Sequence, residues 1–419
     1  MIPWCCPKPG QRLAATLERG LDLCVSALLP LLVIAPHGAA PLVVVAALLG
    51  MPLALAAGAE TWRQLRGWVF LLAAILVWGL VSALWAVEPG RSLLISARLA
   101  GLYAAGLLLI AAVGRIAEPR RLLNHLVAGV AIALILTLVQ FVSHGALTRP
   151  FRARMFADPN LDQVENAFVL ILLPLTAALA SRGRLLLAAA AALAMAVAIY
   201  SLVGTAAQIA FAAGLAAAVL IYLSRRLFSR LAAAASALLV FAAPVVFPPL
   251  LGIDALRRAA EHLSKVSLWH RLEIWSFVGS RIAERPLFGW GLDSSRAIPG
   301  GSELFPAASN PWGLTVEHLP LHPHNVTLQI WLELGAPGAV LFAILAARLW
   351  LSLDAASWPR AYAAAAGGSL AAAFVAALGS YGAWQEWWIG TELLTFFVVL
   401  VLGRLSAQPI PETPRGSIS

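Results

Sequence analysis

The residues best suited to proton transfer lie together in one short run. Residues His322–Asn325 read His-Pro-His-Asn, and an apolar stretch long enough for a helix follows directly. A neutral imidazole is one of the few side chains that can take a proton near neutral pH. Because Pro323 suits the start of a helix, we expect His324 in the first turn of that helix, with Asn325 beside it to orient an imidazole or a substrate hydroxyl. The alternative is a structural histidine that packs against Trp331.

Metal chemistry has little support in the sequence. His322 and His324 are two residues apart in a turn interrupted by proline, and no further zinc ligands can be identified. The chain has no Asp-x-Asp pair, whereas magnesium and manganese prefer clustered oxygen ligands. A glycine-rich loop ending in Lys-Ser or Lys-Thr, typical of nucleotide sites, is also absent from the sequence. We therefore predict a metal-independent protein that needs no cofactor.

The composition indicates a membrane protein. Of the 419 residues, 61% are hydrophobic and only 12% are charged, whereas soluble globular proteins carry about 25% charged residues. A transmembrane helix needs about 20 apolar residues. We predict an all-α polytopic fold with a single transmembrane domain over 1–419 and about twelve spans, near 20–37, 39–57, 68–87, 94–114, 122–143, 165–181, 185–202, 205–223, 231–251, 323–347, 361–380 and 389–403.

Positive residues indicate the orientation of these spans. Arginines gather in alternate short connections, and short loops of this kind stay on the cytoplasmic side. Both termini are therefore predicted to be cytoplasmic. Two longer segments, 143–164 and 252–323, fall on the opposite side and are also rich in arginine. Long loops escape the positive-inside rule, so their cations are available for function. The net charge of +9 follows from this pattern, and we expect no nucleic acid partner.

The longer outer segment contains two stretches with apolar residues at helical spacing. Residues 255–264 and 269–282 are predicted to form amphipathic helices at the membrane interface. Several prolines and glycines that follow them predict irregular structure. Near the C-terminus, the aromatic turn Trp384–Trp388 is predicted to anchor the chain at the membrane interface. The alternative for this turn is sugar stacking, with Glu386 accepting a hydrogen bond from a sugar hydroxyl.

The histidine run is part of a longer pattern. His324 and Asn325 are followed, after nine residues, by Gly335 and Gly338. This arrangement is similar to the H-[NSQ]-x9-G-x-x-G pattern of bacterial O-antigen ligases and related periplasmic oligosaccharide transferases. Taken alone, the two glycines could mark a helix kink or a close packing site.

Two further segments extend the resemblance, in the order that the family has. An arginine and a tryptophan four residues apart, followed by a Pro-x2-Gly-x-Gly turn, resemble the R-x3-W and P-x2-G-x-G elements of the ligase and polymerase superfamily. These residues are Arg271, Trp275, Pro286, Gly289 and Gly291. A weaker match over 154–160 is similar to the family's arginine-to-Pro-Asn segment in an outer loop. The three motifs together span about residues 150–340.

The resemblance implies a GT-C-like glycosyltransferase of the bacterial inner membrane, surrounded by membrane lipids. It would transfer an O-antigen glycan from undecaprenyl diphosphate to lipid A–core on the periplasmic face. His324 would act as general base, and Arg154 and Arg271 would bind the diphosphate, because a guanidinium matches phosphate oxygens in bidentate geometry. Any single arginine could instead bind a lipid headgroup. Further substrate-binding candidates are Arg152, Arg258, Lys265 and Asn325.

One segment departs from the family pattern. After the seventh span relatives commonly have a Ser-Arg-Gly-like turn, whereas residues 204–208 read Gly-Thr-Ala-Ala-Gln. A phosphate contact there cannot be transferred to this chain, and Arg98, Arg152 or Lys265 could substitute for it. Within the same class, the alternatives are an O-antigen polymerase and a protein O-oligosaccharyltransferase. A transporter or flippase is the alternative from another class, although the charges cluster at the membrane edge rather than at the midplane.

Overall fold

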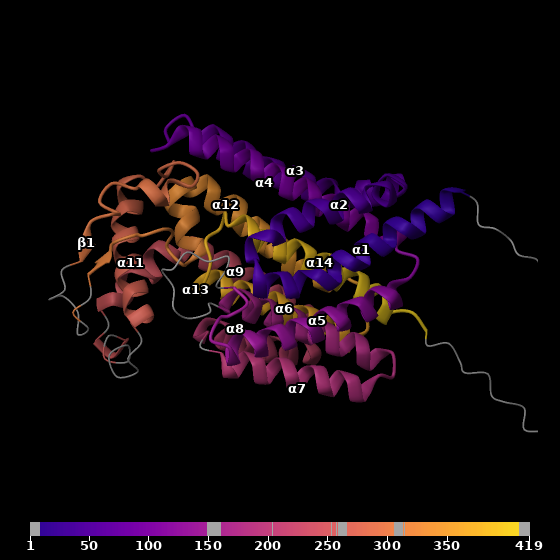
Figure 1. Ribbon diagram of the computed structural model, residues 1–419. Helices are drawn as coiled ribbons and strands as arrows, with labels where there is room; N and C mark the ends of the chain where they lie inside the picture. Colours follow the sequence, from indigo (N-terminus) through magenta and orange to yellow (C-terminus); the bar gives the residue numbers. More distant parts are fainter. Residues whose placement is uncertain are drawn as a thin grey trace, which may run out of the picture.

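The structure is a computed structural model that describes residues 9–148, 161–202, 204–252, 254–256, 258, 266–305, 313 and 315–409. Within these residues, each of the twelve predicted spans corresponds to one helix (Figure 1). The helices are α1 (Pro9–Ile34), α2 (Ala39–Leu55), α3 (Ala59–Ser82), α4 (Pro89–Ala112), α5 (Pro119–Val142), α6 (Asp162–Ser181), α7 (Leu185–Ser201), α8 (Thr205–Leu223), α9 (Arg225–Val246), α12 (Val326–Ala355), α13 (Arg360–Gly379) and α14 (Glu386–Ser406).

Ten of these helices are long and apolar enough to cross a membrane, which confirms the predicted all-α polytopic fold in the described part of the chain. The other two are α7, which has only 17 residues, and α1. Helix α1 carries Glu18 and Asp22, and both carboxylates form ion pairs with Arg121 of α5. The total of about twelve spans depends on these two helices and stays a prediction.

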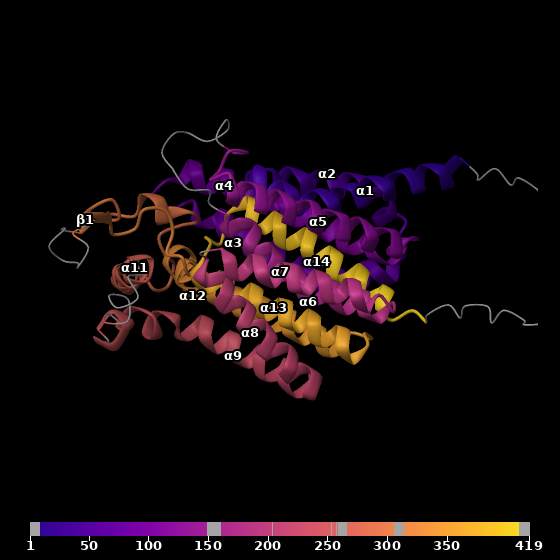
Figure 2. The same cartoon turned by 60° about the horizontal axis from the view of Figure 1, so that its bottom comes forward.

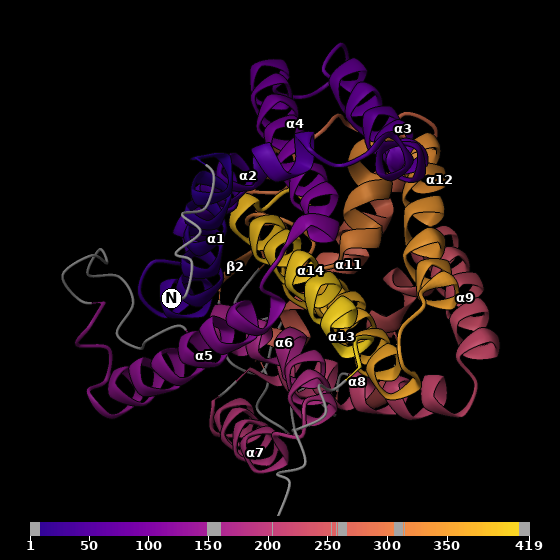
Figure 3. The same ribbon diagram turned by 90° about the vertical axis from the view of Figure 1, so that its right-hand side faces the viewer.

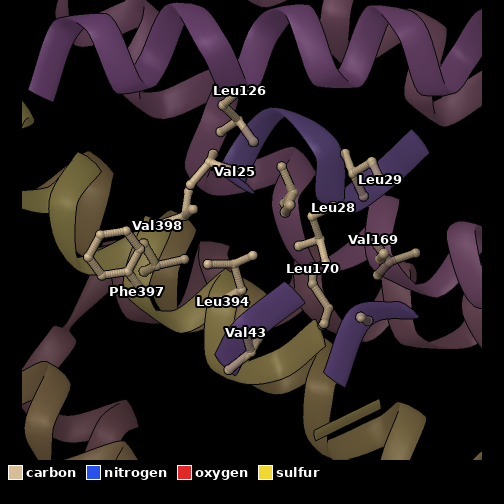
Figure 4. Packing of buried hydrophobic residues seen from close by; sticks show 14 of the residues in the cluster. Val25, Leu28, Leu29, Val43, Leu126, Val169, Leu170, Leu394, Phe397 and Val398 are labelled. Carbon is tan, nitrogen blue, oxygen red and sulfur yellow. The ribbon is translucent and has the colours of Figure 1, made fainter. Parts of the chain in front are cut away.

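Helices α6 and α14 lie at the centre of the bundle. In both helices, 72% of the most apolar stretch is buried inside the protein, compared with 22% in α9. Figure 3 shows α14 running through the middle of the molecule between α2, α5, α6 and α13. Leu28, Val43, Leu170 and Phe397 meet in this core (Figure 4). The central packing fixes the first turns of α6 and α14, which contribute to the site described below.

The segment between α9 and α12 forms a layer at one end of the bundle (Figures 1 and 2). It contains α11 (Val266–Glu284), 3-10 helices at Pro248–Gly252 and Ser294–Ala297, and the antiparallel pair β1 (Leu304–Phe305) and β2 (Val316–Glu317). Helix α1 begins and α14 ends at the opposite end of the molecule. This is the relative placement that the predicted topology requires, and the side of the membrane stays a prediction.

Helix α11 is the second of the two predicted amphipathic helices. Its apolar residues, including Leu272, Ile274 and Val278, are buried against Trp290 and Leu328. The chain's own residues therefore cover the apolar side of α11, and the predicted location of the helix at the membrane interface stays a prediction. The other predicted helix, 255–264, lies mostly outside the described residues.

Candidate active site

His324 has a left-handed backbone and a fixed ring. Its φ is 52°, and its Nδ1 lies 2.7 Å from the carbonyl oxygen of Ser380, in the turn between α13 and α14. A carbonyl oxygen can only accept a hydrogen bond, so Nδ1 carries the hydrogen and Nε2 of the neutral ring keeps its lone pair. Burial lowers the pKa of His324 to about 4. The ring is therefore neutral at physiological pH and presents Nε2 as a proton acceptor.

Helix α12 begins after Asn325, which caps it. The Asn325 Oδ1 atom accepts hydrogen bonds from the Leu328 N–H at 3.2 Å and from the Thr327 hydroxyl at 2.7 Å. His324 therefore precedes the helix. The sequence predicted that it would lie in the first turn, and that prediction is wrong. The Asn325 Nδ2 atom is buried and has no hydrogen-bond partner among the described residues. A substrate contact by Asn325 stays a prediction, and it would use Nδ2.

His322 supports the backbone of His324. Its Nδ1 accepts a hydrogen bond from the His324 N–H at 3.1 Å, and the centroids of the two rings are 4.3 Å apart. The His322 Nε2 atom lies 3.2 Å from the side-chain nitrogen of Gln385. Burial, followed by the charges of His324, Arg296 and Arg271, lowers the pKa of His322 well below its usual value. His322 is therefore neutral and buried, and it holds the backbone of His324 through this hydrogen bond.

Helix α11 holds the histidine run from the other side. The Trp275 indole N–H donates to the Pro323 carbonyl oxygen at 2.9 Å. Arg271 lies one helical turn earlier on the same side of α11, and its charge helps to lower the pKa of His324. The guanidinium donates to the Ser267 carbonyl oxygen at 3.1 Å, and its buried Nε has no hydrogen-bond partner. The R-x3-W spacing thus brings a cation within electrostatic reach of the imidazole.

The first turn of α6 reaches the same place. Burial lowers the pKa of Arg271, and the charge of Asp162 opposes this effect. The Tyr381 hydroxyl donates to the Asp162 carbonyl oxygen and accepts from the Asn166 side-chain amide, each at 2.9 Å. Tyr381 directly follows Ser380 in the chain. Helix α6, helix α11, the start of α12 and the turn between α13 and α14 therefore meet around His324.

The two glycine motifs of the sequence form one contact. Gly335 has a φ of 62° and breaks α12, which frees carbonyl groups of the preceding turn from the helix ladder. The turn 286–291 takes up these groups: its Trp290 and Gly291 N–H groups donate to the carbonyl oxygens of Leu332 and Glu333, both at 2.8 Å. The Pro286 carbonyl oxygen accepts from the first N–H after the break at 3.0 Å. The turn 286–291 thereby holds the part of α12 before Gly335 in place.

The other glycines of these motifs occupy positions that exclude a side chain. A Cβ carbon on Gly289 would lie 2.5 Å from the Glu333 carbonyl carbon, and one on Gly291 would lie 2.5 Å from the Ala86 Cα. Both glycines have a left-handed φ. A Cβ carbon on Gly338 would overlap a side chain of its own helix. The sequence predicted these glycines as motif positions, and the structure gives each a steric reason.

The turn between α13 and α14 completes the site, although the sequence did not predict it there. Trp384 is buried, and its indole N–H donates to Oε2 of Glu333 at 2.5 Å. Trp387 and Trp388 are buried as well. A membrane anchor must face lipid headgroups, so the predicted anchoring role of this aromatic turn is wrong. Only the packing of α13 and α14 on α12 reveals the contact.

Several predicted residues lie elsewhere or are not described. Arg154, Arg152 and Lys265 fall outside the described residues, so their roles stay predictions. Arg258 is described and is exposed. Within the described part of the chain, no three histidine, cysteine or acidic side chains are close enough to hold a metal ion together.

The turn after α7, where relatives commonly carry an arginine, faces a carboxylate in this chain. Glu165 is fully buried, and its Oε2 occupies the place that a Cβ carbon on Gly204 would take. Arg98, one of the predicted substitutes for the arginine, forms an ion pair with Glu386 at 2.8 Å. This pair also gives Glu386 a partner other than a sugar hydroxyl.

Comparison with known proteins supports the resemblance seen in the motifs. Residues 190–343 match the family model described as O-antigen ligase. A "Putative polysaccharide ligase" of Rickettsia typhi is 27% identical over 340 residues, which cover 80% of this chain and 79% of that relative. A relative with the same description from Rickettsia conorii is 29% identical over 297 residues, which cover 69% of this chain and 68% of that relative. No solved structure matches the chain significantly.

Proposed function

We propose that the chain, whose residues 190–343 match the family model described as O-antigen ligase, is a member of that family. It would transfer a preassembled O-antigen glycan from undecaprenyl diphosphate to lipid A–core, at the periplasmic face of the bacterial inner membrane. The observation that carries this proposal is the state of the His324 ring. The Ser380 carbonyl oxygen accepts from Nδ1 at 2.7 Å, which leaves Nε2 as the basic nitrogen. Arg271, the cation expected at the leaving group, lies within electrostatic reach of the same ring.

The proposed reaction is a single displacement. A hydroxyl oxygen of the acceptor sugar forms a bond to the anomeric carbon of the donor. The bond from that carbon to the diphosphate oxygen breaks, and the diphosphate leaves with the bonding electron pair. Nε2 of His324 takes the proton of the attacking hydroxyl. The anomeric carbon is inverted, and the activated donor supplies the energy, so the reaction needs no nucleotide. We also expect it to need no metal, since the sequence offers no clustered oxygen ligands.

The leaving group needs positive charge, and Arg271 is our first candidate to supply it. A guanidinium binds phosphate oxygens through two parallel hydrogen bonds, and negative charge builds up on the diphosphate in the transition state. The buried Nε of Arg271, which has no hydrogen-bond partner, supports this role. Arg154 is proposed as the second diphosphate ligand. Arg152, Arg258, Lys265 and Asn325 remain candidates for further substrate contacts.

Purified protein mixed with lipid-linked O-antigen and lipid A–core tests the proposal. A ligase produces a ladder of glycan on core, read on a gel, and EDTA leaves the rate unchanged. Loss of the ladder on chelation, restored by a divalent ion, would contradict metal independence. Elongated lipid-linked glycan in place of the ladder would indicate a polymerase. Glycan on an added protein would indicate an O-oligosaccharyltransferase, and movement of the lipid across vesicles without a new glycosidic bond would indicate a flippase.

A further inference from the structure

We propose that Glu333 is a positioning residue for His324. It acts by holding the turn 380–385 against the histidine run. Glu333 is fully buried in α12, two residues before the break at Gly335. It does not belong to the matched H-N-x9-G-x-x-G positions, and the proposed reaction does not use it. The inference rests on the proposed function because its main readout is glycan transfer.

The Glu333 carboxylate joins three segments of the chain. Oε2 accepts from the Asp293 N–H and from the Trp384 indole N–H, both at 2.5 Å. Oε1 accepts from the Ser295 hydroxyl at 2.5 Å and from the Gln329 side-chain amide at 3.0 Å. The Ser295 N–H is a further donor to Oε1, at 3.4 Å. An ionised carboxylate has about four lone-pair positions, so these donors occupy all of them. The carboxylate is therefore a complete junction with no capacity left for a substrate.

This junction holds the turn 380–385 at two neighbouring residues. Trp384 binds the carboxylate directly. The Ala383 N–H donates to Oε1 of Gln329 at 2.8 Å, and the amide nitrogen of the same glutamine donates to the carboxylate. The turn begins with Ser380, whose carbonyl oxygen accepts from Nδ1 of His324. Displacement of the turn would remove the acceptor that fixes the imidazole, so the carboxylate acts on the base through the turn.

Glu333→Gln is a specific perturbation of this junction. The new side chain keeps its shape but replaces one oxygen with an NH2 group that can only donate. At the Oε2 position, that group would face two N–H donors, so it takes the Oε1 position. There the Ser295 hydroxyl can rotate to accept, whereas the Gln329 amide nitrogen and the more distant Ser295 N–H, at 3.4 Å, can only donate. Gln329 can avoid the clash only by turning its amide, which directs its NH2 at the Ala383 N–H and loses the hold on the turn.

A swap of the two side chains tests this reasoning. Glu333→Gln and Gln329→Glu are each expected to lower kcat about 10- to 100-fold, the effect of one lost hydrogen bond to a charged group. The affinity for lipid-linked donor should stay unchanged. In the double variant, the new carboxylate at position 329 accepts from both the amide at position 333 and the Ala383 N–H, so kcat should return to within about 3-fold of wild type. Losses that simply add would mean that the two side chains act independently.

The matched control is Glu18→Gln in α1. Glu18 is also a buried carboxylate that accepts a main-chain hydrogen bond, from Glu118 at 2.9 Å, and it lies near the other end of the bundle. This variant should transfer at the wild-type rate. Normal kcat in Glu333→Gln, or a double variant no more active than the single ones, would overturn the positioning role.

Hydrogen exchange of a peptide covering 380–388 provides a readout that does not depend on transfer. Exchange should be faster than wild type in each single variant and should return to the wild-type rate in the double variant. Equal exchange in all four proteins would overturn the inference even if transfer were affected. If the four proteins show this exchange pattern but the wild-type protein makes no ladder, the proposed function is overturned. The positioning of the turn by Glu333 would then still stand.

Discussion

Gly289 and Gly335 lie backbone against backbone. A Cβ carbon on Gly335 would stand 2.8 Å from the nitrogen of Gly289, and the two residues have left-handed φ angles of 69° and 62°. One glycine belongs to the P-x2-G-x-G turn and the other to the break in α12. Two motifs that are separate in the sequence are therefore halves of one structural element, and it supports the part of α12 that follows His324.

Gly335→Ala should destabilise the protein. A side chain in the left-handed region costs about 1–3 kcal/mol, and overlap with the turn adds to this cost. The melting temperature of the purified protein should fall clearly. Gly101→Ala in α4 is the control, because its Cβ carbon would meet no atom within 4 Å and alanine favours a helix by about 0.5–1 kcal/mol. Equal melting temperatures for the two variants would show that the contact carries no strain.

His324→Gln should lower transfer about 10²–10⁴-fold, the usual value of general-base assistance, because glutamine can hydrogen-bond but cannot take a proton. His322→Ala should cost less, about 2- to 10-fold, because it removes one hydrogen bond to the His324 backbone. Initial rates of the purified variants, with donor binding measured in parallel, provide the check. Near-normal turnover in His324→Gln would exclude the base role.

The pH dependence of kcat/KM should report the pKa of the free enzyme's base. Burial disfavours the charged imidazole and lowers the pKa of His324 to about 4, so the ring stays basic well below the ordinary histidine value of about 6.5. We expect kcat/KM to be flat across that ordinary value and to fall as pH drops through about 4. The residual activity of His324→Gln should lack this step. A fall centred at the ordinary value would contradict the buried, neutral ring.

Arg271→Ala should weaken donor binding and transfer by about 10- to 100-fold, the effect of lost hydrogen bonds between charged groups. Arg271→Lys should recover little, because lysine keeps the charge but lacks the planar fork. Donor affinity and kcat/KM are measured for both variants. Arg63→Ala is the control, since Arg63 forms an exposed ion pair with Glu60 at the start of α3. Full activity in Arg271→Lys would mean that a diffuse positive charge is sufficient.

Ser302→Cys should react with an impermeant maleimide in intact spheroplasts after the native cysteines Cys5, Cys6 and Cys24 are replaced. Ser302 is exposed in the layer between α9 and α12, which the arginine pattern assigns to the periplasm. Gln64→Cys, at an exposed position near the start of α3, should react only after lysis. The reverse pattern would invert the topology.

The sequence predicts the helices well because apolar length is a local property, and each of the twelve predicted stretches is helical. It also gives His324 as a candidate base and predicts the glycines of the two motifs. It does not identify the turn 380–385, because Ser380 contributes a main-chain carbonyl oxygen that every residue type possesses. Trp384 was misinterpreted for a related reason: an aromatic residue near a span end has the same sequence pattern whether it faces lipid or a buried carboxylate. Only tertiary packing distinguishes these cases.

The anchoring of the His324 ring at Ser380 also sets an order of events during synthesis of the protein. The chain is made from its N-terminus, so α11 and the turn 286–291 emerge first, and α12 with its histidine follows. The carbonyl that fixes the imidazole comes later, at the end of α13. A ribosome-bound chain that stops after α12 contains both glycine motifs and the histidine but lacks the group that selects its tautomer. The imidazole is therefore held in a single tautomer only after α13 has been made and has joined the bundle.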